Sequence, residues 1–217
     1  LLVTDFIRIK RWFNSGPGYM VKEFDYLKLK FDFNPKKIIS INHHMAHAAS
    51  AYYASGFQDA AVLIVDGNGS DLQTTSFFDA SNGKINMIDE YKAQGIGAVY
   101  NVVTSSILNL GRGGEGKTMG LAPYGARHKQ VLNCRGKLDG IKNDFSSFVR
   151  RQPWSDILNY TEPESRIKPL KNDYRVPESE KDLLNPYFSR VAFDVQDETE
   201  RVVIHLGKEI AKRTGKK

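Results

Sequence analysis

The feature that most constrains the fold is the run Ala60–Asp66 (AAVLIVD), a continuous stretch of apolar residues that ends in an aspartate. Such a run predicts a strand inside a layered structure. The turn Gly67-Asn68-Gly69 follows it directly. Two further strands are expected at 74–79 and 84–91, joined by a hairpin through Ser81-Asn82-Gly83. Together with the helices expected around them, these strands predict an α/β fold.

Helices are expected before and after these strands. Residues 43–55 are rich in Ala and contain neither Gly nor Pro, so they predict a helix that Gly56 ends. Residues 98–110 have apolar side chains at helical spacing, and residues 185–213 predict one long helix. The apolar face of that long helix carries Val195, Val202, Leu206 and Ile210.

The 217 residues are enough for one sizeable core. Upstream, we expect a helix near 20–31 and a short strand at 37–42. The stretch from about 126 to 186 is polar and contains five of the eight prolines, so it predicts a loop-rich excursion. We therefore expect one domain with its core at 36–125 and 186–214. Because the first residue is Leu rather than Met, we also expect a piece of a longer chain.

Charge and cysteine content limit the partners. The net charge is +6, but the longest basic runs are pairs, so the distribution does not favour a nucleic-acid partner. The single cysteine, Cys134, excludes a disulfide framework and fits a reducing compartment. No stretch is apolar enough to span a membrane or to form a signal peptide, so a cytoplasmic location without a membrane partner is expected. The oligomeric state stays open, a homodimer included.

The first motif with chemical meaning is His43-His44-Met45-Ala46-His47, which contains three of the five histidines. On a helix, His43 and His47 lie one turn apart on the same face, which suits two imidazoles that bind one metal ion. The alternative is that they are ordinary polar residues at a helix N-terminus. Because no Glu stands between them, a zinc peptidase of the HExxH type is disfavoured.

The second motif is Asp66-Gly67-Asn68-Gly69. Ligands bind in α/β sheets at the C-terminal ends of strands, where Asp66 is expected. Its carboxylate could complete a metal site with His43 and His47. The two glycines would let backbone N–H groups approach a phosphate. The alternative is an ordinary turn built from Asp, Gly and Asn.

The third motif, Gly111–Thr118 (GRGGEGKT), matches the P-loop pattern, which needs a strand before it and a helix after it. A helix is expected before it. After it, Met119–Gly125 contains two glycines and a proline, so we expect a glycine-rich loop and no helix. Lys117 and the backbone amide of Gly116 still suit an anionic ligand. A P-loop nucleotide hydrolase remains the alternative function.

These motifs together resemble the O-carbamoyltransferases of the NodU/CmcH type. The matching segments are His43–Phe57, Val65–Gly69 with Thr74-Thr75-Ser76, and Glu115–Gly125, with a weaker match at Val195–Glu200. The resemblance implies a partial actin-like ATPase (ribonuclease H-like) domain, related to proteins that modify tRNA with a threonylcarbamoyl group. It also implies a YrdC-like module, absent from this sequence, that makes carbamoyl adenylate from carbamoyl phosphate and ATP.

The implied reaction moves the carbamoyl group onto a hydroxyl of a sugar, an antibiotic or a nodulation-factor type acceptor. Members of the family hold iron or a similar divalent metal through two histidines and aspartates, which fall on His43, His47 and Asp66. Lys117 and the N–H groups of the Gly67-Asn68-Gly69 turn would hold phosphate oxygens. His44 is the candidate base or substrate contact, and Glu115 is a weaker candidate.

The resemblance also implies parts that this sequence does not contain. An opening pair of strands should precede Leu1, and a Gly-rich strand with another metal aspartate should follow Lys217. Ser70 stands where an acid is expected, with Asp71 behind it. We therefore expect this segment to be inactive alone, and a non-catalytic fragment is the third reading.

Overall fold

The computed structural model describes residues 41–69, 71–111, 113–149, 183 and 185–216. The first described elements form the sheet and its cover: α3 (His43–Ser55), β1 (Asp59–Val65), β2 (Thr75–Ser81) and β3 (Lys84–Tyr91). The others form the helical layer and its connections: α4 (Ile96–Val102), the π-helical turn η2 (Val103–Ile107), α5 (Glu115–Leu121), the 3₁₀ turn η3 (Ala122–Gly125), β4 (Lys137–Asp139), β5 (Lys142–Asp144), α6 (Ser146–Val149) and α7 (Pro186–Thr214).

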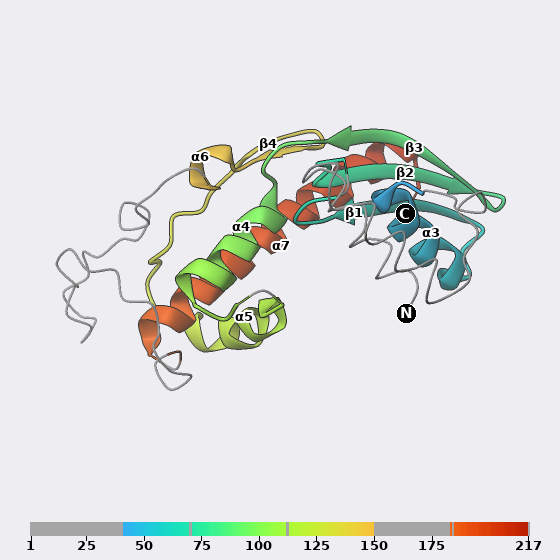
Figure 1. Cartoon of the computed structure of the whole chain (residues 1–217). Coiled ribbons are helices and arrows are strands. Elements are labelled where there is room, and N and C mark those ends of the chain that lie inside the picture. Colours follow the sequence, from blue (N-terminus) through green and yellow to red (C-terminus); the bar gives the residue numbers. More distant parts are fainter. Residues whose placement is uncertain (1–40, 70, 112, 150–182, 184, 217) are drawn as a thin grey trace, which may run out of the picture.

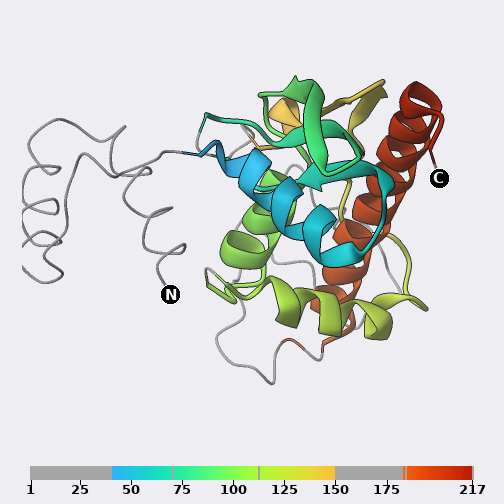
Figure 2. The same ribbon diagram turned by 90° about the vertical axis from the view of Figure 1, so that its right-hand side faces the viewer.

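The sheet is antiparallel in the order β1-β2-β3, with helices on both of its faces (Figures 1 and 2). Side chains of β1 point alternately into two hydrophobic cores, which explains why this strand is apolar throughout. Val62 and Ile64 pack with α3, whereas Leu63 and Val65 pack against the core under α4 and α7. The expected strand and α/β layer are therefore confirmed.

Helix α3 confirms the prediction for residues 43–55. Asn42 caps its N-terminus by accepting a hydrogen bond from the Met45 N–H at 3.1 Å. Gly56 ends it in the left-handed conformation, with φ at 76°. Ala48 and Tyr52 are its buried apolar side chains and pack on the sheet.

The long C-terminal helix α7 is also confirmed, and its predicted apolar face is the face that is buried. The helix expected at 98–110 begins two residues earlier, at Ile96, and its last turn is π-helical. The helix expected near 20–31 and all but the last two residues of the strand expected at 37–42 lie outside the described residues. Across the described ranges, no helix has the length and apolar character needed to cross a membrane.

The prediction of a loop throughout 111–125 is wrong, because residues 115–121 form α5. Packing overrides the low helix propensity of this segment. A side chain at Gly114 would come within 2.6 Å of the Leu110 carbonyl oxygen, so the glycine permits a close approach before the helix. Thr118 then forms a buried hydrogen bond of 2.8 Å to Thr104.

Residues 131–149 also differ from the expectation of an excursion outside the core. Their elements are short, yet they bury Leu132, Ile141, Phe145 and Phe148 in the main cluster. The carboxylate of Asp194, on α7, accepts hydrogen bonds of 2.8 Å from the backbone N–H groups of Val131 and Leu132. A polar segment thus enters the core because α7 supplies partners for its backbone.

Candidate metal centre

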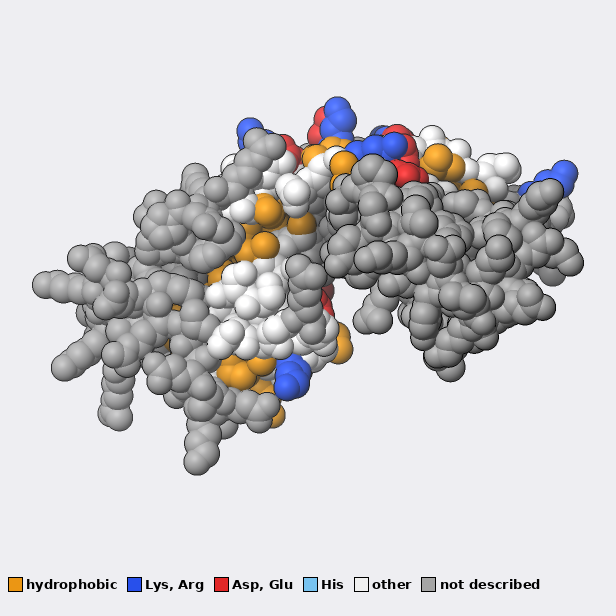
Figure 3. Space-filling view, in the orientation of Figure 1, with side chains coloured by type: hydrophobic (Ala, Val, Ile, Leu, Met, Phe, Trp, Pro, Cys, Tyr) orange, Lys and Arg blue, Asp and Glu red, His pale blue; other side chains and the backbone are white. Residues whose placement is uncertain are grey.

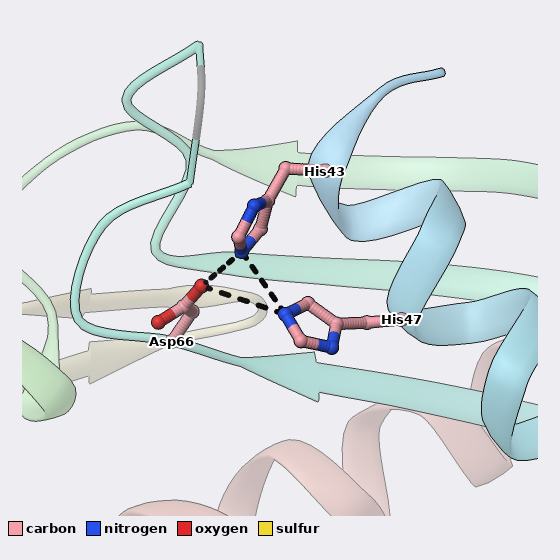
Figure 4. A group of neighbouring side chains, drawn as sticks. All are labelled: His43, His47 and Asp66. Carbon is pink, nitrogen blue, oxygen red and sulfur yellow. Dashed lines mark hydrogen bonds and ion pairs between the residues drawn. The ribbon is translucent and has the colours of Figure 1, made fainter. Parts of the chain in front are cut away.

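Two histidines of α3 form the first half of the candidate site. His43 and His47 lie one helical turn apart, and their Nε2 atoms are 3.0 Å from each other. The rings meet edge to face, with centroids 4.6 Å apart (Figure 4). The predicted shared face is therefore confirmed.

Asp66 provides the second half and follows β1 directly. Its Oδ2 atom lies 2.8 Å from His43 Nε2 and 4.0 Å from His47 Nε2 (Figure 4). Its Oδ1 atom accepts a hydrogen bond of 2.6 Å from the Gly67 N–H, which orients the carboxylate. All three candidate ligand atoms lie within 4.8 Å of one another.

This donor set fits a divalent transition metal. Imidazole nitrogens and carboxylate oxygens are common ligands of zinc, iron and manganese. Partial burial raises the pKa of Asp66, but the hydrogen bond and charge of His43 and the Gly67 N–H outweigh burial and hold that pKa below its usual value. The carboxylate is therefore ionised at neutral pH, as metal binding requires.

His44 lies between the two ligand candidates in sequence but points into the protein. Its side chain is fully buried, and its Nδ1 atom is 2.6 Å from Ser76 Oγ on β2. Burial lowers the pKa of His44, although Asp66 acts in the opposite direction. The predicted role as a base or substrate contact stays a prediction, and the ring faces the interior rather than solvent.

The turn after Asp66 is held by its own hydrogen bonds. The Gly67 N–H donates to Asp66 Oδ1, and the Gly69 N–H donates to the Gln73 carbonyl oxygen at 2.7 Å. Asn68 is exposed. The two glycine N–H groups predicted to hold phosphate thus have partners within the protein, and the phosphate role stays a prediction.

Sequence reasoning missed the contacts that hold α3 on this turn. Asn42 donates from Nδ2 to Asp71 Oδ2 at 2.8 Å while it caps the helix. An Asn immediately before the Ala-rich run was the available signal for the cap. Gly97, in the first turn of α4, lies so close to Asp66 that a side chain there would come within 2.5 Å of the Asp66 carbonyl oxygen.

The residues predicted in the third motif lie elsewhere. Glu115, Gly116 and Lys117 are on α5, which both views draw apart from α3 (Figures 1 and 2). Glu115 accepts a hydrogen bond of 3.1 Å from Asn101, and Lys117 is exposed. The structure does not bring these residues to His43, His47 and Asp66. Because the segment before Gly111 is helical, the requirement of a P-loop for a preceding strand is not met.

Charges of both signs mix along the upper edge of the face in Figure 3. Ion pairs at the sheet join side chains of opposite charge, such as Arg213 with Asp89 at 2.6 Å and Lys92 with Glu90 at 2.5 Å. On the described part of this face, basic side chains do not form a patch of their own, in keeping with the charge pattern of the sequence.

Comparison with known proteins decides the family. Residues 10–215 match the family model described as the carbamoyltransferase N-terminus. The chain belongs to the carbamoyltransferase family. This assignment confirms the resemblance to the NodU/CmcH type.

Relatives of this chain include two nodulation proteins. It is 33% identical over 118 residues to NolNO of Sinorhizobium fredii, covering 53% of this chain and 16% of NolNO. It is 34% identical over 85 residues to NolO of Bradyrhizobium diazoefficiens, covering 39% of this chain and 15% of NolO. An uncharacterized Synechocystis protein is 31% identical over 175 residues, which cover 80% of this chain and 28% of that protein. The chain thus spans less than a third of the length of each of these relatives.

Proposed function

We propose that this chain is the actin-like (ribonuclease H-like) N-terminal module of a cytoplasmic O-carbamoyltransferase and holds part of its metal centre. The observation that carries the proposal is the convergence of His43, His47 and Asp66 within 4.8 Å in a chain of this family. The reaction transfers a carbamoyl group from carbamoyl adenylate, made from carbamoyl phosphate and ATP, to an acceptor hydroxyl. Two relatives named as nodulation proteins support a nodulation-factor type acceptor as the first to assay.

In this proposal, His43, His47 and Asp66 hold a divalent metal, iron or a similar ion. When bound, the metal supplies a Lewis acid that can polarise a carbonyl or phosphoryl oxygen. His43 and His47 offer their Nε2 atoms, which already face Asp66. The Gly67 N–H occupies Asp66 Oδ1, so Oδ2 is the oxygen left toward the histidines. The protein thereby presents its ligand atoms from two separate elements.

Lys117 is the proposed contact for an anionic group of the substrate. Its exposed ammonium lies on α5, so it would meet the substrate at a place separate from the two histidines. A substrate with a phosphate and a carbamoyl group has two ends that two such places could bind.

The test is the double substitution His43→Ala with His47→Ala in the natural protein that contains this sequence. Removing both imidazoles should abolish bound metal and carbamoyl transfer together. Metal content is measured by elemental analysis, and transfer is measured with carbamoyl phosphate, ATP and a panel of hydroxyl acceptors. His128→Ala, at an exposed histidine of the loop after η3, is the matched control. Transfer at the wild-type rate by the metal-free double variant would refute the metal-assisted mechanism.

A further inference from the structure

One buried nitrogen beside the metal centre has no hydrogen-bond partner among the described residues. It is Nε2 of His44, whose other ring nitrogen is anchored by Ser76 at 2.6 Å. Leaving a buried polar atom without a partner is unfavourable, so such an atom in a folded protein calls for an explanation. This atom lies 4.0 Å from Asp66 Oδ2.

This nitrogen is one of three histidine nitrogens that surround Asp66 Oδ2. The Nε2 atoms of His43, His44 and His47 lie 2.8, 4.0 and 4.0 Å from Asp66 Oδ2. The side chains of His43 and His47 are 13% and 49% exposed, whereas that of His44 is 0% exposed. His44 therefore lies on the buried side of Asp66 Oδ2, whereas the side chains of His43 and His47 are partly exposed to solvent.

Gly69 is a second, independent observation, because it packs closely against this nitrogen and leaves no room for a side chain. A side chain at Gly69 would come within 2.9 Å of His44 Nε2 and 2.9 Å of Gln73 Oε1. Gly69 does not have the left-handed backbone conformation that favours glycine, so backbone conformation alone does not require a glycine here. The second glycine of the Asp-Gly-Asn-Gly turn is thus needed for close packing on His44.

We propose that His44 is the positioning residue of the metal centre. In this proposal, the Ser76 hydroxyl is the donor to Nδ1, so that the single ring proton lies on Nε2, the nitrogen 4.0 Å from Asp66 Oδ2. At 4.0 Å this N–H acts on the carboxylate through its dipole, because the distance exceeds that of a hydrogen bond. It thereby favours the carboxylate orientation that presents Oδ2 to a metal held by His43 and His47. The inference rests on the proposed metal centre and assigns the residue that orients it.

Two substitutions separate the two nitrogens of His44. The amide of His44→Asn can retain the contact with Ser76 but does not reach the place of Nε2, whereas the amide of His44→Gln reaches that place. We expect His44→Asn to weaken Co²⁺ binding roughly 10–100-fold, as loss of an outer-shell partner does, and His44→Gln to recover most of the affinity. The affinity is measured by titrating the natural protein that contains this sequence with Co²⁺, followed by visible absorption.

The shape of the Co²⁺ spectrum distinguishes positioning from direct ligation. A positioning residue leaves the ligand set unchanged, so His44→Asn should keep the wild-type band positions, whereas His47→Ala should shift them. His128→Asn is the matched control and should bind as the wild type does. Wild-type affinity in His44→Asn, or a spectrum altered in the same way as in His47→Ala, would overturn the proposal.

Ser76→Ala keeps the test decisive if His44→Asn fails to fold. It removes only the hydroxyl that anchors Nδ1, and it should weaken Co²⁺ binding in a chain whose circular dichroism is unchanged. Unchanged affinity in this folded variant would refute the role of His44. Absence of Co²⁺ binding by the wild type would instead refute the proposed metal centre itself, so the two failures are distinguishable.

Discussion

At the scale of single residues, Asp66 is the point where several elements meet. Its backbone N–H donates to the Thr74 carbonyl oxygen at 2.9 Å. Its Oδ1 atom accepts a hydrogen bond from the Gly67 N–H, and its Oδ2 atom contacts His43 Nε2. Gly97 of α4 packs against its carbonyl group. The orientation of the carboxylate therefore depends on residues that would never touch a metal ion.

Gly97→Ala tests this dependence. The new methyl group would lie 2.5 Å from the Asp66 carbonyl oxygen, so the turn after β1 must shift. We expect a loss of about 1–3 kcal/mol in the free energy of unfolding, typical of overpacking, together with weaker metal binding. Urea unfolding and Co²⁺ titration measure the two effects.

Gly207→Ala is the matched control for this substitution. Gly207 lies inside α7, and nothing stands within 4 Å of the position of its missing side chain. This change should raise the free energy of unfolding by about 0.5–1 kcal/mol and leave metal binding unchanged. If both alanine variants behaved alike, close packing at Gly97 would not be the cause.

At the scale of elements, α7 holds the preceding segment through two buried carboxylates. Glu198 accepts hydrogen bonds from the Gly136 N–H at 2.9 Å, from Arg135 at 2.7 Å and from Arg201 at 2.6 Å. Burial acts to raise the pKa of Glu198, but these donors outweigh it and hold the pKa below its ordinary value. Helix α7 thus uses the ionised carboxylate of Glu198, on its buried face, to hold the polar segment around Arg135 and Gly136.

Glu198→Gln should lower the free energy of unfolding by about 3 kcal/mol at pH 7. This value is the lower end of the range for breaking a buried ion pair, because the partners Arg135 and Arg201 are partly exposed to solvent. A depressed native pKa contributes stability above the unfolded value, here 4.5, and this contribution is lost as the pH falls through the native pKa. The difference between wild type and variant should therefore shrink below about pH 4.5. Urea unfolding at pH 7 and at acidic pH measures it.

Glu200→Gln, at an exposed position of α7, is the control and should change stability by less than about 0.5 kcal/mol at either pH. A difference between wild type and Glu198→Gln that stayed constant on acidification would contradict an ionised Glu198 as the source of the stability.

Also at this scale, the sequence predicted elements with a strong local pattern and missed those set by packing. The Ala-rich run of α3 and the apolar face of α7 carry their own periodicity, and both were predicted correctly. Helix α5 was missed because it depends on the close approach of Gly114 to Leu110 and on the buried hydrogen bond between Thr118 and Thr104. The local sequence pattern contains neither contact.

The candidate site also contains residues that the sequence pattern predicted and a contact that it did not predict. His43 and His47 are one turn apart in any helix, and Asp66 ends a recognisable strand, so pattern and family resemblance together named all three. The contact of His44 with Ser76 was not predictable, since it depends on how α3 lies across β2.

At the scale of the whole molecule, the two faces of the sheet are covered unequally. The core under α4 and α7 is large, whereas α3 is attached through the smaller cluster of Ala48, Tyr52, Val62, Ile64, Phe78 and Ala80. Helices that bury little apolar surface open locally at lower free energy than the main core does. The proposed metal would join α3 to the turn after β1 and oppose that opening.

Hydrogen exchange should reveal this effect of the metal within one molecule. At a Co²⁺ concentration 100 times Kd, bound metal stabilises the closed state by about 2.7 kcal/mol, so amide exchange in α3 should slow up to roughly 100-fold. Amides in the last turn of α7 serve as the internal reference and should keep their rates, since fraying of a helix end does not release a ligand atom. Mass spectrometry of peptides from both helices measures the rates, with the double variant His43→Ala, His47→Ala as control. Equal slowing in α3 and in the last turn of α7, or any slowing in the double variant, would show that the metal does not act at the contact between α3 and the sheet.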